Sequence, residues 1–268
     1  MDLREIIRSV TTYNFHAHTQ WCDGHNTLEE IALAAADKGF THFGFSPHSP
    51  VPVDSPCNMS EMNLPAYFDE IKRVRKLLEH RMKVYCGVEI DYLGDYWGPS
   101  NPLFADERFD FSIGSVHFVP TQEGVPVDID GRFDSFKMRM AENFHNDIRY
   151  VVGKYYEQSH LMLEKGGFTI LGHFDKIAHN ASCFMPGIED QQWYKSMIGD
   201  YIDHIVESGV IVEINTKARE QYGRFFPHER YWERLIKAGV DIAVNSDAHY
   251  CDRVDASRAE AFALLNRI

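Results

Sequence analysis

Histidines and carboxylates recur in this sequence at the ends of short apolar runs. These side chains are His16, His18, His48, Glu89, His117, His173, Asp247 and His249. Imidazole nitrogens and carboxylate oxygens are the ligands that proteins use for zinc, manganese and iron. The chain also contains 14 histidines among 268 residues, roughly twice the number expected for an average composition. The pattern therefore indicates a site for divalent metal ions.

Each part of this pattern has an ordinary explanation when it is taken alone. His16 and His18 are two residues apart in a strand-like run, which places both side chains on one face whatever their purpose. A single histidine such as His117 is commonly a hydrogen-bonded core or surface residue, and Asp247 could belong to an ordinary turn. Glu89 lies between Val88 and Ile90, where burial without a charge partner would be costly. The joint pattern, rather than any one residue, favours the metal site.

The apolar runs that precede these side chains predict β-strands. The predicted strands cover residues 13–16, 42–46, 83–90, 111–116, 169–172, 210–214 and 241–245. Helical patterns lie between them, at 27–38, 64–80, 145–165, 190–207, 228–237 and 256–267. Thr27 and Glu30 have the spacing of a capping box, which marks the start of the first of these helices.

Strands that alternate with helices predict an α/β fold built from parallel βα units. In one domain of residues 1–268, this pattern favours a barrel of about seven or eight strands. An open doubly wound sheet is the alternative, but residues 15–19 follow the first strand in place of a glycine-rich phosphate loop. In a parallel barrel the residues that follow the strands meet at one mouth. The barrel would therefore bring the histidines and carboxylates together.

The charge balance restricts the partners that this chain could have. It carries 27 Lys and Arg against 40 Asp and Glu, a formal net charge of −13. Binding to nucleic-acid backbones depends on an excess of cationic side chains, so we expect no nucleic-acid partner. A phosphate-bearing substrate would need another source of positive charge, and metal ions are the obvious candidate.

The sequence indicates neither membrane insertion nor export. It has no run of the roughly 18 apolar residues that a membrane helix needs, and its first residues lack a signal-peptide pattern. Five scattered cysteines fit a reduced compartment. These features predict a cytoplasmic protein and leave its oligomeric state open.

Taken in order along the chain, these motifs resemble the polymerase and histidinol phosphatase (PHP) family of metal-dependent phosphoesterases. The matching segments are residues 15–19, 46–48, 87–92, 114–118, 172–175 and 245–249. Residues 87–92 and 115–118, with 213–216, are most similar to the histidinol-phosphatase branch. The resemblance implies a distorted (β/α)7 TIM-like barrel and a site for three divalent transition metal ions, which could be Zn, Mn or Fe.

The resemblance also implies how the ligands are divided among the ions. The first ion would be held by His16, His18, Glu89 and Asp247. Glu89 would bridge to a second ion, which His117 and His173 complete. The third would be held by Asp23, His48 and His249. His25 is an alternative to Asp23, because it lies two residues later in the same loop.

The reaction implied by the family is hydrolysis of a small phosphate monoester, specifically L-histidinol phosphate in histidine biosynthesis, by a hydroxide that bridges two metal ions. Glu89, Asp247 and His249 are the candidate catalytic residues, and Asp247 or a metal-bound histidine would move the proton.

Two pairs of residues are candidates for contacting the substrate. Lys217 and Arg219 are candidates for binding its phosphate, although cations in such loops are often only solvated. Asp91 and Asp95 could receive an ammonium group, or could be solvated loop carboxylates.

This function has two alternatives. A related phosphatase or phosphodiesterase could act on another small phosphate ester or on a nucleotide. A non-catalytic metal-binding barrel is disfavoured, because every expected ligand position is occupied by a suitable side chain.

Overall fold

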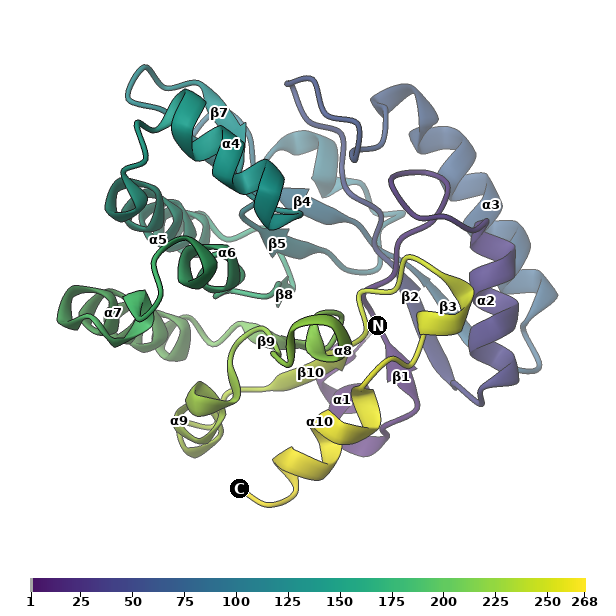
Figure 1. Cartoon of the computed structure of the whole chain (residues 1–268). Helices are drawn as coiled ribbons and strands as arrows, with labels where there is room; N and C mark the ends of the chain where they lie inside the picture. Colours follow the sequence, from purple (N-terminus) through teal and green to yellow (C-terminus); the bar gives the residue numbers. More distant parts are fainter. Residues whose placement is uncertain (1) are drawn as a thin grey trace.

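The computed structural model describes residues 2–268 and has parallel strands at its centre with helices outside them (Figure 1). The parallel strands are β1 Tyr13–Asn14, β2 His42–Phe45, β3 Lys83–Cys86, β4 Glu89–Asp91, β5 Ile113–Ser115, β8 Ile170–Leu171, β9 Ile211–Asn215 and β10 Ile242–Asn245. Each predicted strand run overlaps one of these strands, with β9 ending one residue beyond its run, and the run 83–90 contains β3 and the start of β4. The strand prediction is therefore confirmed.

The strands follow one another around a ring. The hydrogen-bonded orders are β1-β2-β3 and β10-β9-β8-β5-β4, and every pair in them is parallel. Single parallel bridges join the two sheets on both sides, from His48 to Glu89 and from Ala17 to Ala248. This arrangement confirms the predicted α/β barrel and disfavours the open sheet.

Helices surround the strands (Figure 1). They are α1 Leu3–Ser9, α2 Leu28–Asp37, α3 Leu64–Leu77, α4 Phe133–Asn143, α5 Ile148–Lys165, α6 Ile177–Phe184, α7 Gln192–Ser208, α8 Arg219–Tyr222, α9 Trp232–Lys237 and α10 Arg258–Leu265. Short 3₁₀ helices cover Glu61–Asn63, Pro102–Ala105, Ile188–Asp190, Glu229–Tyr231 and Cys251–Arg253. The predicted capping box is present, because the Thr27 side chain accepts from the Glu30 N–H while Glu30 Oε2 accepts from the Thr27 N–H at 2.8 Å. No helix among the described residues is both long and apolar enough to cross a membrane.

The sequence analysis missed four helices and a hairpin. The helices are α1, α4, α6 and α8, and the hairpin pairs β6 Phe118–Pro120 with β7 Pro126–Asp128 in antiparallel register. Prolines at 120 and 126 flank the turn of the hairpin, and proline within a run counts against a strand prediction. The hairpin and α4 form the upper left part of Figure 1, above the strand ends.

An apolar layer fills the barrel beneath the strand ends. Phe15 and Phe111 pack inside it with their ring centroids 5.5 Å apart. A Cβ atom at Gly87 would lie 2.3 Å from the Phe111 ring, and one at Gly44 would lie 2.7 Å from it, so both positions require glycine. The polar side chains that follow the strands therefore rest on a tightly packed apolar floor.

Candidate metal centre

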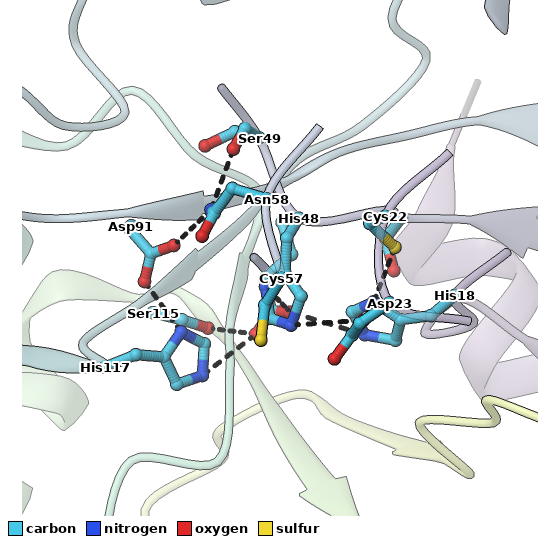
Figure 2. Close-up of polar contacts among 12 residues, drawn as sticks. His18, Cys22, Asp23, His48, Ser49, Cys57, Asn58, Asp91, Ser115 and His117 are labelled. Carbon is cyan, nitrogen blue, oxygen red and sulfur yellow. Dashed lines mark hydrogen bonds and ion pairs between the residues drawn. The ribbon is translucent and has the colours of Figure 1, made fainter. Parts of the chain in front are cut away.

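The nine predicted ligand residues lie together above this floor. Eight lie just after the ends of barrel strands or at the bridges beyond them, and Asp23 comes from the loop before α2. Five of the nine line one cavity of about 210 Å³: Asp23, His48, His117, Asp247 and His249. Figure 2 shows His48 between His117 on one side and His18 with Asp23 on the other. The convergence predicted from strand ends is thus present in the structure.

Three histidines surround one oxygen of Glu89. Glu89 Oε2 lies 3.2 Å from His16 Nε2, 3.4 Å from His18 Nε2 and 3.1 Å from His48 Nδ1. Both Glu89 Oε2 and His48 Nδ1 are buried, and neither has a hydrogen-bond partner among the described residues. These atoms therefore converge on a shared space rather than bonding to each other, which is the arrangement that a cation requires.

The other oxygen of Glu89 faces a second pair of histidines. Oε1 accepts a hydrogen bond from Ser115 Oγ at 2.7 Å and lies 3.0 Å from His173 Nε2 and 3.6 Å from His117 Nε2. The two histidine Nε2 atoms are 3.2 Å apart. Glu89 therefore offers one oxygen to each of two neighbouring histidine groups, as a bridging carboxylate would.

A third group forms around Asp23. Its Oδ1 atom lies 3.6 Å from His18 Nδ1, 3.9 Å from His48 Nε2 and 3.3 Å from His249 Nε2. This oxygen is also buried without a hydrogen-bond partner among the described residues. His25, the alternative ligand, instead stacks on Tyr250 with ring centroids 4.3 Å apart.

The ligand atoms group differently from the division that the resemblance implied. The compact groups are His16, His18 and Asp247; His18, Asp23, His48 and His249; and His48, Glu89 and His117. His18 and His48 each belong to two groups. Each presents its two ring nitrogens to different neighbours, so both rings lie between adjacent groups of ligand atoms.

A second layer of carboxylates orients the histidines. His16 Nδ1 lies 2.7 Å from Glu213 Oε1, and His117 Nδ1 lies 2.6 Å from Asp91 Oδ1. Asn58 Nδ2 donates to the other Asp91 oxygen at 3.0 Å (Figure 2). A carboxylate that accepts the Nδ1 proton turns the Nε2 lone pair toward the centre. Asp91 is therefore a buried partner of His117, neither a solvated loop residue nor a free ammonium acceptor.

Neighbouring side chains and burial shift the pKa values of Glu89 and His18 at the centre. Burial alone would raise the pKa of Glu89, but His16, His48 and His117 outweigh it and hold that pKa well below the usual range. Burial and the nearby His249 and His48 rings lower the pKa of His18 well below its usual value. A negative Glu89 and a neutral His18 are the protonation states that bind metal ions.

Asp247 occupies a backbone position that fixes its direction. Its φ angle is 49°, in the left-handed region that non-glycine residues rarely adopt. The next residue, Ala248, forms the bridge to Ala17, and Asn215 Nδ2 donates to Asp247 Oδ2 at 3.0 Å. These contacts leave Asp247 Oδ1 3.1 Å from His18 Nε2. Strained backbone held in this way is common at functional sites.

The two cations predicted to bind phosphate have different surroundings. Lys217 Nζ lies 3.5 Å from Asp247 Oδ1 and 3.1 Å from His249 Nε2, at the edge of the centre. Arg219 instead begins α8 and donates to Glu260 Oε1 at 2.5 Å, with its guanidinium over the Phe225 ring. The structure does not bring Arg219 to the centre, because its charge is already paired elsewhere.

Sequence reasoning missed three charged residues near the centre. Glu213 lies within the apolar strand β9, the same signal that singled out Glu89, so it could have been found. Lys176 and Asp130 form an ion pair of 2.8 Å beside the cavity. Asp130 lies outside every predicted element, and Lys176 lies four residues beyond the predicted strand 169–172. No local pattern therefore indicated that these two residues meet.

Known proteins match this chain over most of its length. The PHP domain family model matches residues 14–217, which confirms the resemblance seen in the sequence. A Deinococcus radiodurans relative named "Probable histidinol-phosphatase" is 26% identical over 259 residues, covering 92% of this chain and 89% of the relative. The histidinol-phosphatase of Bacillus subtilis is 24% identical over 252 residues, covering 87% of this chain and 92% of the relative.

A solved structure has the same fold. It is the histidinol phosphate phosphatase of Lactococcus lactis, complexed with zinc, L-histidinol and phosphate. It superimposes with a TM-score of 0.73 and 19% sequence identity, covering 97% of this chain and 94% of that chain.

Proposed function

The chain belongs to the PHP domain family, and from this premise we propose that it is a metal-dependent phosphomonoesterase. Its substrate would be L-histidinol phosphate, which it would hydrolyse to L-histidinol and phosphate in histidine biosynthesis. The proposal takes residues 1–268 as one PHP-type barrel domain that binds three divalent ions, Zn, Mn or Fe. It is supported by two relatives named histidinol-phosphatase and by a structural neighbour named histidinol phosphate phosphatase.

One observation carries the proposal: three buried ligand atoms at the centre have no hydrogen-bond partner among the described residues. They are Asp23 Oδ1, His48 Nδ1 and Glu89 Oε2. Leaving such atoms without a partner would cost about 1–3 kcal/mol each, and more for a charged group. Divalent cations fit these residues, because imidazole and carboxylate are the donors that they prefer.

The chain's own residues would prepare the site for a phosphate ester. Divalent ions bound here would draw negative charge from the phosphate and make a water molecule more acidic. Glu89, Asp247 and His249 would hold them, while Glu213 and Asp91 keep His16 and His117 turned toward the centre. Lys217 would add a positive charge at the edge. Together these groups explain how a chain of net charge −13 could bind a dianion.

A substrate panel tests the proposal. Purified protein loaded with Zn, Mn or Fe is assayed for phosphate release from L-histidinol phosphate and from unrelated monoesters and nucleotides. We expect kcat/KM to be at least about tenfold higher for L-histidinol phosphate, because discrimination by pocket contacts is typically 10-fold or more. Equal or faster turnover of unrelated phosphates would favour the alternative, a related phosphatase or phosphodiesterase with another substrate.

A further inference from the structure

The cavity at the metal centre is adjacent to a second chamber of similar size. The second chamber has a volume of about 230 Å³ and is lined by His179, Tyr222 and Phe226, residues of α6, α8 and the loop after α8. The residues that line both spaces are Asp130, Gly131, Lys176, Lys217 and Asp247. A substrate with its phosphate in the first chamber would therefore have room for its alcohol in the second.

Lys176 lies on the wall that the chambers share. Its side chain is only 16% exposed, and its Nζ atom lies 2.8 Å from Asp130 Oδ2. Burial alone would lower the pKa of Lys176, but Asp130, Asp247 and Glu89 outweigh it and raise that pKa. The Asp130 carboxylate therefore holds the ammonium group at the boundary between the two spaces.

Two stacked aromatic rings line the second chamber. The rings of His179 and Tyr222 stack with centroids 3.9 Å apart and planes 24° from parallel. Offset stacking of a planar ring on such a surface is favourable by about 0.5–1.5 kcal/mol beyond the area it buries. The chamber therefore fits an alcohol that carries a planar heteroaromatic ring.

We propose that Lys176, held by Asp130, donates a hydrogen bond to the ester oxygen of the substrate, with the phosphate in the first chamber and the alcohol in the second. This inference rests on the proposed phosphomonoesterase function and adds the group that assists the departing alcohol. Lys176 is then a catalytic residue, and Asp130 is a positioning residue that acts through it.

The chemistry of the step explains why a cation is useful there. Hydrolysis forms a bond between phosphorus and a water oxygen, breaks the bond between phosphorus and the ester oxygen, and leaves a proton from water on the alcohol. Negative charge grows on the ester oxygen while its bond breaks. A fixed ammonium at that oxygen binds the transition state more strongly than the ground state.

Two phosphate esters with different leaving groups test the role of Lys176. Metal-loaded wild type and Lys176→Met are compared on L-histidinol phosphate, whose alkoxide is a poor leaving group, and on 4-nitrophenyl phosphate, whose phenolate leaves without help. We expect kcat/KM to fall about 100-fold or more for the alkyl ester and less than about fivefold for the aryl ester. Equal losses on both esters, or no loss on either, would overturn the assignment.

Matched variants separate this role from a structural one. Lys176→Met leaves Asp130 without its partner, so the double variant Lys176→Met with Asp130→Asn should keep the same selective loss on the alkyl ester. Lys176→Arg should recover most of the alkyl-ester activity. Metal content and Tm are measured for each variant, and a selective loss that disappears in the folded, metal-loaded double variant would contradict the proposal.

A binding measurement tests the second chamber without turnover. Calorimetry with L-histidinol should show weaker binding to metal-loaded Tyr222→Ala than to wild type, while the Kd for inorganic phosphate stays within about twofold. Equal L-histidinol binding to both proteins would exclude the alcohol from this chamber. If wild type hydrolyses other alkyl phosphates but not L-histidinol phosphate, the proposed function fails, and the leaving-group comparison is then made on those esters.

Discussion

Two regions of the barrel mouth each contain a buried glutamate, and their surroundings are opposite. Around Glu213, four groups supply hydrogen bonds: His16 Nδ1 and Asn245 Nδ2 reach Oε1 at 2.7 and 3.0 Å, and the His173 N–H and Asn215 Nδ2 reach Oε2 at 3.0 and 3.2 Å. Around Glu89 Oε2, three histidine nitrogens approach without forming a hydrogen bond.

The difference distinguishes a carboxylate that orients a histidine, Glu213, from a candidate metal ligand, Glu89. Both residues are at most 1% exposed, so burial does not distinguish them. The donors around Glu213 satisfy its charge within the protein. Glu89 Oε2 has no such donor and faces a space lined by histidine nitrogens. Saturation by hydrogen bonds, rather than residue type or burial, therefore identifies the ligand.

The largest effect should come from Glu89→Gln, which removes the charge and keeps the shape. Because Glu89 faces two histidine groups, the variant should lose at least one bound metal ion per chain. Activity should fall by about 100- to 1,000-fold, since a metal ion contributes several kcal/mol to the transition state. Elemental analysis and kcat/KM check both results. Unchanged metal content and activity would refute the bridging role.

Glu213→Gln should affect stability more than chemistry. A Gln amide would direct N–H groups at donors that now share the carboxylate, so the free energy of unfolding should fall by about 2–3 kcal/mol with or without metal. Metal affinity should fall by about 10- to 100-fold, because His16 loses its orienting partner. Chemical denaturation and metal titration measure the two effects. A Glu213 variant of wild-type stability that loses its metal completely would reverse the contrast with Glu89.

Asp91→Asn should change how the metal-free protein responds to pH. Burial alone would lower the pKa of His117, but Asp91 and Glu89 raise it to about 9, above the unfolded value of about 6.5. Protonated His117 therefore stabilises the folded protein. This stabilisation is fully present below about pH 6.5 and is lost as the pH rises through about 9. In Asp91→Asn this loss should be smaller. Denaturation of both metal-free proteins from pH 6 to pH 10 checks the difference, and parallel pH profiles would count against it.

The smallest expected effect distinguishes Lys217 from Arg219, the two cationic residues predicted to bind phosphate. Lys217→Met should weaken inhibition by inorganic phosphate by about 3- to 10-fold, because its ammonium lies beside Asp247 and His249. Arg219→Met is the matched control, since its charge is paired with Glu260, and should change inhibition by less than about twofold. A larger effect of Arg219→Met than of Lys217→Met on this inhibition would identify Arg219 as the residue that binds phosphate.

Much of the ligand set could be predicted from the sequence because it depends on strand ends. His16, Glu89 and Asp247 each follow an apolar run, and parallel strands in a barrel bring their carboxyl ends to one mouth. The strands could be recognised because short β-rich runs recur between helical patterns. Position along the chain was therefore enough to bring these residues together.

The positions of other charged residues depend on contacts between distant parts of the chain, which no local sequence pattern predicts. Asp91 looked like a loop residue, but it is buried against His117 and Asn58. Arg219 and Lys217 are two residues apart, yet the short α8 turns one toward Glu260 and leaves the other at the centre. The Lys176–Asp130 pair joins two loops that are 46 residues apart in the chain. Such pairings are set by the packing of whole elements.

Anomalous scattering from crystals of the metal-loaded protein tests the central contrast most directly. The account predicts metal peaks coordinated by both oxygens of Glu89, with the imidazoles of His16, His18, His48, His117 and His173 around them, and no metal contact to Glu213. A peak coordinated by Glu213, or a Glu89 carboxylate that contacts no metal at full occupancy, would contradict it.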